Sequence, residues 1–117
     1  MRHRKEGRKF HREKGQRKAF VRSVLLAFLK IGKIETTEAR AKSIRPMAER
    51  AITIAKKGGV ANRRLLLARL HDKKVVQKLM DDLGPRYADR KGGYARITKL
   101  AKTRKRDATR LVEISLV

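Results

Sequence analysis

Apolar residues recur at helical spacing in the N-terminal part of the chain, across about residues 16–31. One stripe, at intervals of three and four positions, is formed by Phe20, Val24, Ala27 and Ile31. The apolar surface is widened by Leu25, Phe28 and Leu29. A helix that is apolar on most faces is buried on most faces, so we expect it near the centre of the fold. Gly32 follows and is expected to cap its C-terminus in the left-handed conformation.

A short strand and a long helix are predicted next. Residues 33–36 follow the glycine with β-branched side chains, which favours a strand. Thr37 can then cap the N-terminus of a helix over residues 38–57. Its buried stripe is expected to consist of Ala41, Ile44, Ala48, Ala51, Ile52 and Ala55. The pair Gly58-Gly59 should end this helix.

Two further helices and a hairpin are predicted in the rest of the chain. The third helix covers residues 60–70. Asp72 is expected to cap a fourth, and Gly84-Pro85 should stop it. Its buried stripe is expected to be Val75, Val76, Leu79, Met80 and Leu83. Residues 94–100 and 110–117 are predicted to be the two strands of a hairpin. In the second strand, Val112, Ile114 and Leu116 alternate with Glu113 and Ser115.

This order of elements predicts an α+β fold with about four helices and a small sheet. We expect two parts, a basic N-terminal arm of residues 1–18 and a single globular domain of residues 19–117. Ile44, Leu79 and Ile114 each lie on the apolar side of their element, so they should share one core. Tyr94, in a predicted strand, is expected in the core rather than on a binding surface.

The charge of the chain is strongly positive. Thirty-four Lys and Arg residues and eleven Asp and Glu residues give a formal net charge of +23. Self-repulsion at this density opposes compaction, and a polyanion relieves it. Nucleic acid is the first candidate, because neutralised phosphates release counterions, and an anionic membrane surface is the second. No apolar window is long enough to cross a membrane, and no secretory signal is recognisable, so we expect a protein of the cytosol or an organelle matrix.

The predicted arm carries much of this charge. Residues 1–18 hold nine Lys and Arg residues, two Glu and one large apolar residue, Phe10. Such a segment cannot bury enough apolar surface to offset its ordering entropy, so we expect it to be disordered on its own. Basic N-terminal arms commonly bind nucleic acid; a solvated tail without function is the alternative.

The residue types that catalysis needs are scarce. His3 and His11 lie in the arm, which cannot hold a catalytic base rigidly against a substrate. His71 lies next to Asp72, which is better explained as a helix cap. There is no cysteine and no spacing of metal ligands. We therefore expect no enzymatic activity, no cofactor, no metal and no small-molecule substrate.

Two Lys-Gly-Gly runs, at residues 57–59 and 91–93, are candidates for phosphate binding. Glycines expose backbone N–H groups, and a helix that follows adds the positive end of its dipole. The first run precedes the third helix, whose opening turn holds Asn62, Arg63 and Arg64. For both runs an ordinary glycine turn is an equally good interpretation.

Cations occur on the arm, on the helix surfaces and in both late loops. This distribution favours a protein that lies among several RNA segments and contacts phosphate and sugar. A sequence-specific DNA reader would concentrate its polar residues on one exposed helix. Phe10, Tyr87 and Tyr94 are too few for a platform on which bases stack.

Five motifs follow one another along the chain. They are MRHRK with Gly7-Arg8-Lys9, Thr36-Thr37 with Ala41-Lys42, Val60-Ala61-Asn62-Arg63-Arg64-Leu65, Gly84-Pro85-Arg86-Tyr87, and Gly92-Gly93-Tyr94-Ala95-Arg96-Ile97. In order and spacing they resemble the protein-seventeen family of the bacterial large ribosomal subunit. The resemblance covers nearly the whole chain. It implies helices on a small mixed β-sheet and a structural constituent of the large ribosomal subunit that supports translation. It also implies a place on large-subunit ribosomal RNA (rRNA) near the polypeptide exit, beside neighbouring ribosomal proteins.

The chain departs from the family pattern in two places. Residues 10–16 differ, so the family's arm contacts carry over only as far as Lys9, with the addition of Arg12. The loop at residues 102–107 also differs, and whether it binds RNA does not follow from the resemblance. Neither departure changes the family that the motifs indicate.

Together, charge and resemblance nominate a set of RNA-binding residues. They are Arg2, His3, Arg4, Lys5, Arg8, Lys9, Arg12, Arg17, Lys18, Arg22, Lys42, Arg45, Asn62, Arg63, Arg64, Arg86, Arg90, Lys91, Arg96, Arg104, Lys105 and Arg106. A nucleoid-type DNA-binding protein would fit the composition alone, but the motif series favours a ribosomal protein. An RNA-processing enzyme would need an acid–base pair that the sequence lacks.

Overall fold

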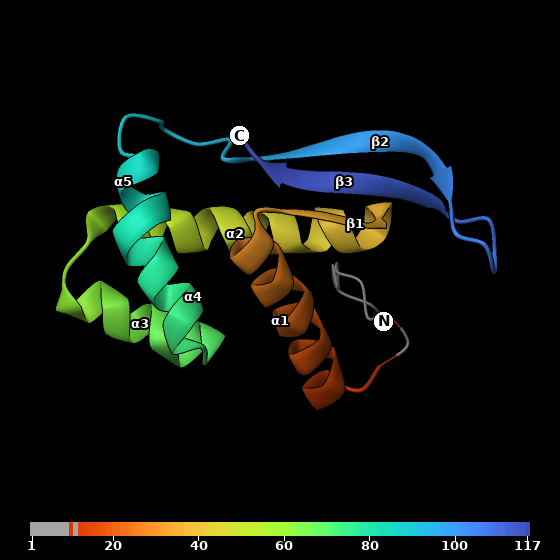
Figure 1. Cartoon of the computed structure of the whole chain (residues 1–117). Helices are drawn as coiled ribbons and strands as arrows, with labels where there is room; N and C mark the ends of the chain where they lie inside the picture. Colours follow the sequence, from red (N-terminus) through yellow and green to blue (C-terminus); the bar gives the residue numbers. More distant parts are fainter. Residues whose placement is uncertain (1–9, 11) are drawn as a thin grey trace, which may run out of the picture.

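The computed structural model describes residues 10 and 12–117 and shows an α+β fold within them (Figure 1). The helices are α1 (Lys14–Ile31), α2 (Glu38–Lys57), α3 (Val60–Leu70), α4 (Lys73–Lys78), the π-helix η1 (Leu79–Leu83) and α5 (Gly84–Arg86). The strands are β1 (Lys33–Thr37), β2 (Ala95–Thr103) and β3 (Arg110–Leu116). Because α4, η1 and α5 follow one another without a break, they form one helical segment, and the described residues contain four such segments in all. The predicted α+β fold with about four helices is therefore confirmed.

The helix ends follow the predicted caps. Gly32 adopts the left-handed conformation, with a φ of 88°, and its N–H donates to the Phe28 carbonyl at 2.7 Å. The Thr37 hydroxyl accepts from the Arg40 N–H at 3.5 Å at the start of α2. The Asp72 carboxylate accepts from the first-turn N–H groups of α4. These local signals therefore set the boundaries of α1, α2 and α4.

The central element is α2, which lies between the sheet and helices α1, α3 and α4 (Figure 1). All six residues of its predicted stripe are buried. The expectation that α1 lies at the centre is wrong. It packs against α2, α4 and β1 on one side and buries only Leu25, Phe28 and Leu29. Ile31, which was predicted on its buried stripe, is 70% exposed because that side of the helix has no neighbour.

The sheet has the strand order β1-β3-β2, and both pairs are antiparallel. Ile114 of β3 is opposite Ile34 on one side and Ile97 on the other. The expectation of a mixed sheet is therefore wrong. β1 and β2 do run in the same direction, but β3 lies between them, so no parallel pair forms.

The fourth helix does not stop at Gly84-Pro85, contrary to expectation. The chain widens into the π-helix η1, where the Gly84 N–H donates to the Leu79 carbonyl five residues back. It then continues helically to Arg86. Gly84 lies against α2, since a β-carbon there would be 3.0 Å from the Ala55 carbonyl oxygen. A glycine and a proline thus allow a tight crossing instead of ending the helix.

The core joins α1, α2, α3, the fourth helical segment and the sheet. Ile44, Leu79 and Ile114 are at most 1% exposed and belong to one cluster, as predicted. Tyr94 is also buried, at 1% exposure, and its hydroxyl donates to the Arg90 carbonyl at 3.0 Å. This confirms Tyr94 as a core residue. No helix in the described residues is long and apolar enough to span a bilayer.

The start of α1 corrects one boundary. Disorder was expected through residue 18, but residues 14–18 form the first turn and a half of the helix. Residues 1–9 and 11 lie outside the described residues, and with them His3 and most of the predicted arm.

Candidate nucleic-acid interface

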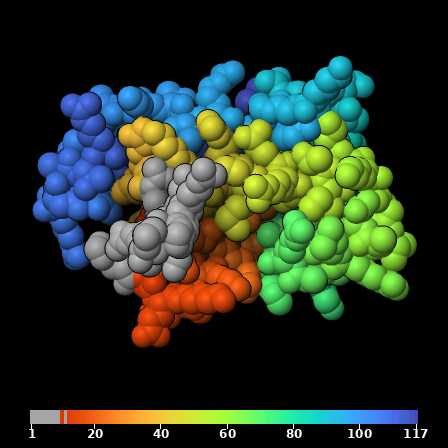
Figure 2. All heavy atoms as spheres, turned by 180° about the vertical axis from the view of Figure 1, so that it is seen from behind, coloured from red at the N-terminus to blue at the C-terminus, as the bar shows by residue number. Residues whose placement is uncertain are grey.

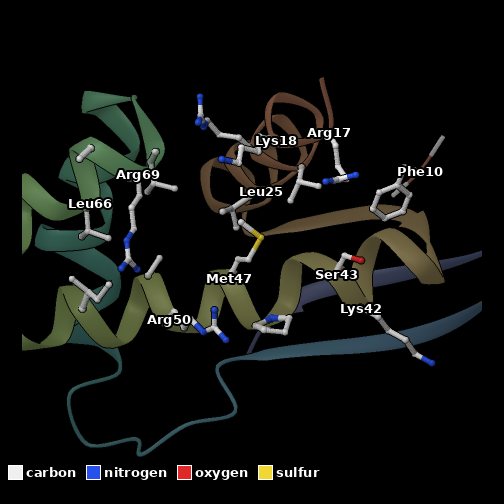
Figure 3. A pocket seen from close by; sticks show the side chains of 17 residues that line it. Phe10, Arg17, Lys18, Leu25, Lys42, Ser43, Met47, Arg50, Leu66 and Arg69 are labelled. Atoms are coloured by element: carbon white, nitrogen blue, oxygen red, sulfur yellow. The ribbon is translucent and has the colours of Figure 1, made fainter. Parts of the chain in front are cut away.

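A groove with a volume of about 740 Å³ lies between α1, α2 and α3 and is called the α1–α2 groove below. Figure 2 shows the face of the molecule on which these helices come together, and Figure 3 shows the groove from close by. Its apolar floor is lined by Val21, Leu25, Met47, Ala51, Ile54, Leu66 and Leu70. Its cationic rim consists of Arg17, Lys18, Arg22, Lys42, Arg50 and Arg69. No described residue that lines the groove is acidic.

The rim contains both expected and unexpected residues. Arg17, Lys18, Arg22 and Lys42 are nominated by the sequence; Arg50 and Arg69 are not. A signal for Arg50 exists, because Met47, Arg50 and Ile54 repeat at intervals of three and four and so share one face of α2. That face is separate from the buried stripe. Arg69 has no comparable signal, since only the packing of α3 against α2 brings it to the groove.

A second cationic feature surrounds the ring of Phe20 at one end of the groove. The guanidinium of Arg12 lies 3.8 Å from the ring centroid, and that of Arg40 lies 4.9 Å from it. The ring of Phe10 makes an edge contact at 5.5 Å. Arg12 also donates to the Phe10 carbonyl at 2.8 Å. Cation–π contacts therefore hold Arg12, a predicted RNA-binding residue, against the domain.

The first Lys-Gly-Gly run forms the turn between α2 and α3, as predicted. Gly58 and Gly59 both have positive φ, and Gly59 is the N-cap of α3 without a side-chain hydrogen bond. Asn62 donates through Nδ2 to the Gly58 carbonyl at 2.6 Å, so its amide tightens the turn. Arg63 and Arg64 are exposed beside it and form no ion pair within the described chain.

The second Lys-Gly-Gly run differs, because strand β2 follows it instead of a helix. Its loop is tied to α2 through Tyr94, whose hydroxyl accepts from Lys56 at 2.8 Å. Lys56 also donates to the Arg90 carbonyl. The side chains of Arg90 and Lys91 are exposed, with Arg90 donating to the Gly92 carbonyl at 3.1 Å. This run lacks the helix dipole that the first run has.

The hairpin carries the last group of candidates. Arg104 pairs with Asp107 at 2.6 Å and lowers the pKa of that carboxyl to about 2, with help from the Thr109 N–H. Lys105 and Arg106 are exposed in the same loop, at the end of the hairpin that extends away from the domain (Figure 1). Arg96 is exposed on β2.

Ion pairs divide the candidates into two groups. Four have a carboxylate partner, namely Lys42 with Glu38, Arg45 with Glu49, Arg86 with Asp82, and Arg104 with Asp107. Each of these presents less net positive charge to a ligand than a cation without a partner. The candidates Arg2, His3, Arg4, Lys5, Arg8 and Lys9 lie outside the described residues.

Asp72, the acidic residue beside a histidine, has a structural role. Asp72 caps α4, as predicted, and hydrogen bonding from the Val75 N–H is the main cause that lowers its pKa. Its neighbour His71 ends α3 in the left-handed conformation. In residues 10 and 12–117 no group of three or more potential metal-ligating side chains occurs. What the arrangement offers chemically is anion binding at several separate surfaces.

Comparison with known proteins identifies the class. The family described as Ribosomal protein L17 has a sequence model that matches residues 20–117. The chain is 47% identical over 117 residues, all of it and 83% of the relative, to the large ribosomal subunit protein bL17 of Erythrobacter litoralis (strain HTCC2594). It is 48% identical over 110 residues, 94% of this chain and 97% of the relative, to bL17 of Thermoanaerobacter sp. (strain X514). It is also 44% identical over 117 residues, all of it and 99% of the relative, to bL17 of Hydrogenobaculum sp. (strain Y04AAS1).

The class is thus that of the ribosomal proteins, which are structural components of the ribosome rather than enzymes. The stretch that the family model matches contains the positions of the four motifs between Thr36 and Ile97. The chain belongs to the ribosomal protein L17 family. The family resemblance inferred from the motifs is therefore confirmed.

Proposed function

We propose that this chain is a structural constituent of the large ribosomal subunit that binds and stabilises folded large-subunit rRNA and so supports translation. Binding occurs mainly through phosphate and sugar, near the polypeptide exit. The observation that carries this proposal is the presence of cations without carboxylate partners on several separate surfaces of a family member. These surfaces are the rim of the α1–α2 groove, the start of α3 and the end of the hairpin.

Separate cationic surfaces suit a protein that contacts several RNA segments at once. A single recognition helix would read one groove of one duplex. Here α1, α3 and the hairpin present their cations from different elements (Figure 1). Contacts of this kind recognise the shape and backbone of folded RNA.

At the start of α3 we propose that Arg63 and Arg64 bind phosphate together with the first-turn N–H groups. No side chain caps these groups, so they remain available to an anion. The two arginines are exposed next to them. Arg90 and Lys91 are further phosphate contacts from the neighbouring loop, where no helix follows the glycines.

The outer face of the sheet carries charges of both signs, which suits RNA less than a surface of cations alone does. Glu35 and Glu113 are directly opposite each other in the β1–β3 pair, and Lys33, two residues from Glu35, lies on the same face. Lys102 forms an ion pair with Glu35 at 3.1 Å. Arg96 extends from the same face, because it is two residues from Thr98, the partner of Glu113. We therefore propose that neighbouring ribosomal proteins, rather than rRNA, contact this face.

The cellular compartment of the chain is that of the ribosome to which it belongs, because the family is one of ribosomal proteins. We propose a cytoplasmic ribosome, and a ribosome of an organelle matrix is compatible with the same residues. Sedimentation of a cell extract in a sucrose gradient tests this assignment. Comigration of the chain with large subunits supports it, and a free or chromosome-bound pool contradicts it.

The contribution of the arm is tested by salt dependence. Residues 1–9 contain five Lys and Arg residues. If they contact phosphate, deletion makes the dependence of log K on log salt shallower by roughly 0.7–0.9 per lost contact. Equilibrium binding to a large-subunit rRNA fragment measures the slope for the full chain and the truncated chain. An unchanged slope means that the arm is solvated in the complex.

A further inference from the structure

We propose that the α1–α2 groove holds one unpaired nucleotide of rRNA, with its base on the apolar floor and its flanking phosphates on the cationic rim. This inference rests on the proposed rRNA binding and specifies one site within it. This surface combines a hollow, an apolar floor and cations. The smaller hollow at the end of the hairpin, of about 400 Å³, has no apolar floor, because it is lined by Arg104, Lys105, Arg106 and Asp107.

The floor suits a flat, weakly polar group. On the floor, Met47 is 38% exposed, whereas Leu25, Leu66 and Ala51 are buried. The side chain of methionine is unbranched and polarisable and adapts to the surface of a ring. The volume of about 740 Å³ is within the range of pockets that bind small organic ligands, roughly 300–1,000 Å³. One base with its ribose is a ligand of that size class.

The rim suits phosphates on both sides of that base. Arg17, Lys18 and Arg22 come from α1, on one side of the floor. On the other side are Lys42 and Arg50 of α2, with Arg69 of α3 (Figure 3). Within the described chain, only Lys42 among them has an ion pair, at 2.9 Å from Glu38. The remaining five are therefore available to an anionic ligand.

An acidic protein segment is the competing occupant, and the arrangement favours RNA over it. An amphipathic helix carries its acidic residues along the edges of one face, whereas a nucleotide carries one phosphate on its 5′ side and one on its 3′ side. Four of the six rim residues are arginines, whose planar guanidinium groups stack on unpaired bases and bind phosphate through two N–H groups. A single unpaired nucleotide thus matches floor and rim together.

The test uses two RNA hairpins of equal length, one fully paired and one with a single bulged adenosine. The full chain is compared with Met47→Glu, which puts a carboxylate on the apolar floor of the groove. Leu65→Glu is the matched control. Leu65 is 39% exposed, as against 38% for Met47, and it does not line the groove. Both variants change the net charge equally, and circular dichroism checks that each is folded. If Met47→Glu does not fold, Met47→Trp fills the groove without a change in charge.

We expect the wild-type chain to prefer the bulged hairpin about tenfold, because stacking of one base is worth a factor of this order. Met47→Glu should abolish the preference, and Leu65→Glu should keep it. A wild-type chain that binds both hairpins equally overturns the groove proposal while rRNA binding stands. If Met47→Glu still prefers the bulged hairpin, the groove proposal is overturned as well. An acidic protein segment is then the remaining candidate for the occupant of the groove. Binding to neither hairpin, nor to an rRNA fragment, contradicts the proposed function itself.

Discussion

The crossing of α5 over α2 is tested by replacing Gly84 with alanine. Gly84 has a helical conformation, with φ and ψ both at −57°, so alanine meets no backbone strain there. The new β-carbon would be 3.0 Å from the Ala55 carbonyl oxygen and 3.1 Å from that of Leu79. Both contacts are backbone atoms of packed helices, and these cannot rotate away as a side chain could.

The expected effect is a difference between two opposing contributions. Overpacking of a tight contact typically costs about 1–3 kcal/mol. Alanine regains about 0.8–1 kcal/mol over glycine in a helix. We therefore expect Gly84→Ala to lower the free energy of unfolding by up to about 2 kcal/mol. Gly15→Ala is the control, because Gly15 is also helical and a β-carbon there has nothing within 4 Å; it should stabilise by about 0.5 kcal/mol.

Thermal unfolding of the free protein measures both effects. For a chain of 117 residues, the unfolding entropy is about 0.25 kcal/mol/K near the midpoint. Gly84→Ala should then lower the Tm by up to about 8 °C, and Gly15→Ala should raise it by about 2 °C. A Tm for Gly84→Ala raised as much as that of Gly15→Ala would refute the tight crossing. Equal decreases of the Tm in both variants would show that the cost of replacing glycine does not come from the contact between Gly84 and α2.

Three further predictions concern the core, the phosphate site and one carboxyl group. Leu79→Ala removes a fully buried side chain and should cost about 2–5 kcal/mol in urea denaturation; a loss under about 0.5 kcal/mol would contradict the core assignment. Replacing Arg63 and Arg64 together by Gln should weaken rRNA binding at an unchanged Tm; a lower Tm with unchanged affinity would make them structural. The pKa of Asp107 is lowered from 3.8 to about 2, chiefly by Arg104, so its stabilising contribution is present above about pH 4 and is lost as the pH falls towards 2. In an NMR titration, Arg104→Gln should return this pKa towards 3.8, and an unchanged value would exclude the Arg104 hydrogen bond as its cause.

Local signals in the sequence were sufficient for much of the fold. The bounds of α2 and α3 were predicted because Thr37 and Gly58-Gly59 act within a few residues of the helix ends. The continuation through Gly84-Pro85 could not be predicted in that way. Whether a glycine ends a helix or allows a close crossing depends on what lies beside it, here the Ala55 carbonyl from a distant helix.

The candidate site could be predicted only in part, for a similar reason. The sequence identifies which residues are cationic, and the spacing of Glu38 and Lys42 even indicates their ion pair. The α1–α2 groove depends on tertiary packing, since Arg22, Arg50 and Arg69 come from three helices. Periodicity places Arg50 on a second face of α2, but that this face lines a groove depends on the helices packed beside it.

The position of β3 between β1 and β2 also governs when the fold can be completed during synthesis. β1 ends at Thr37, but its partner does not begin until Arg110. At about 5–20 residues per second, β1 waits roughly 4–15 s for that partner. The helices can form from nearby contacts in this interval, whereas the sheet cannot. A chain that stalls before Arg110 therefore exposes two strands with unpaired edges, which makes it prone to aggregation and recognisable to chaperones.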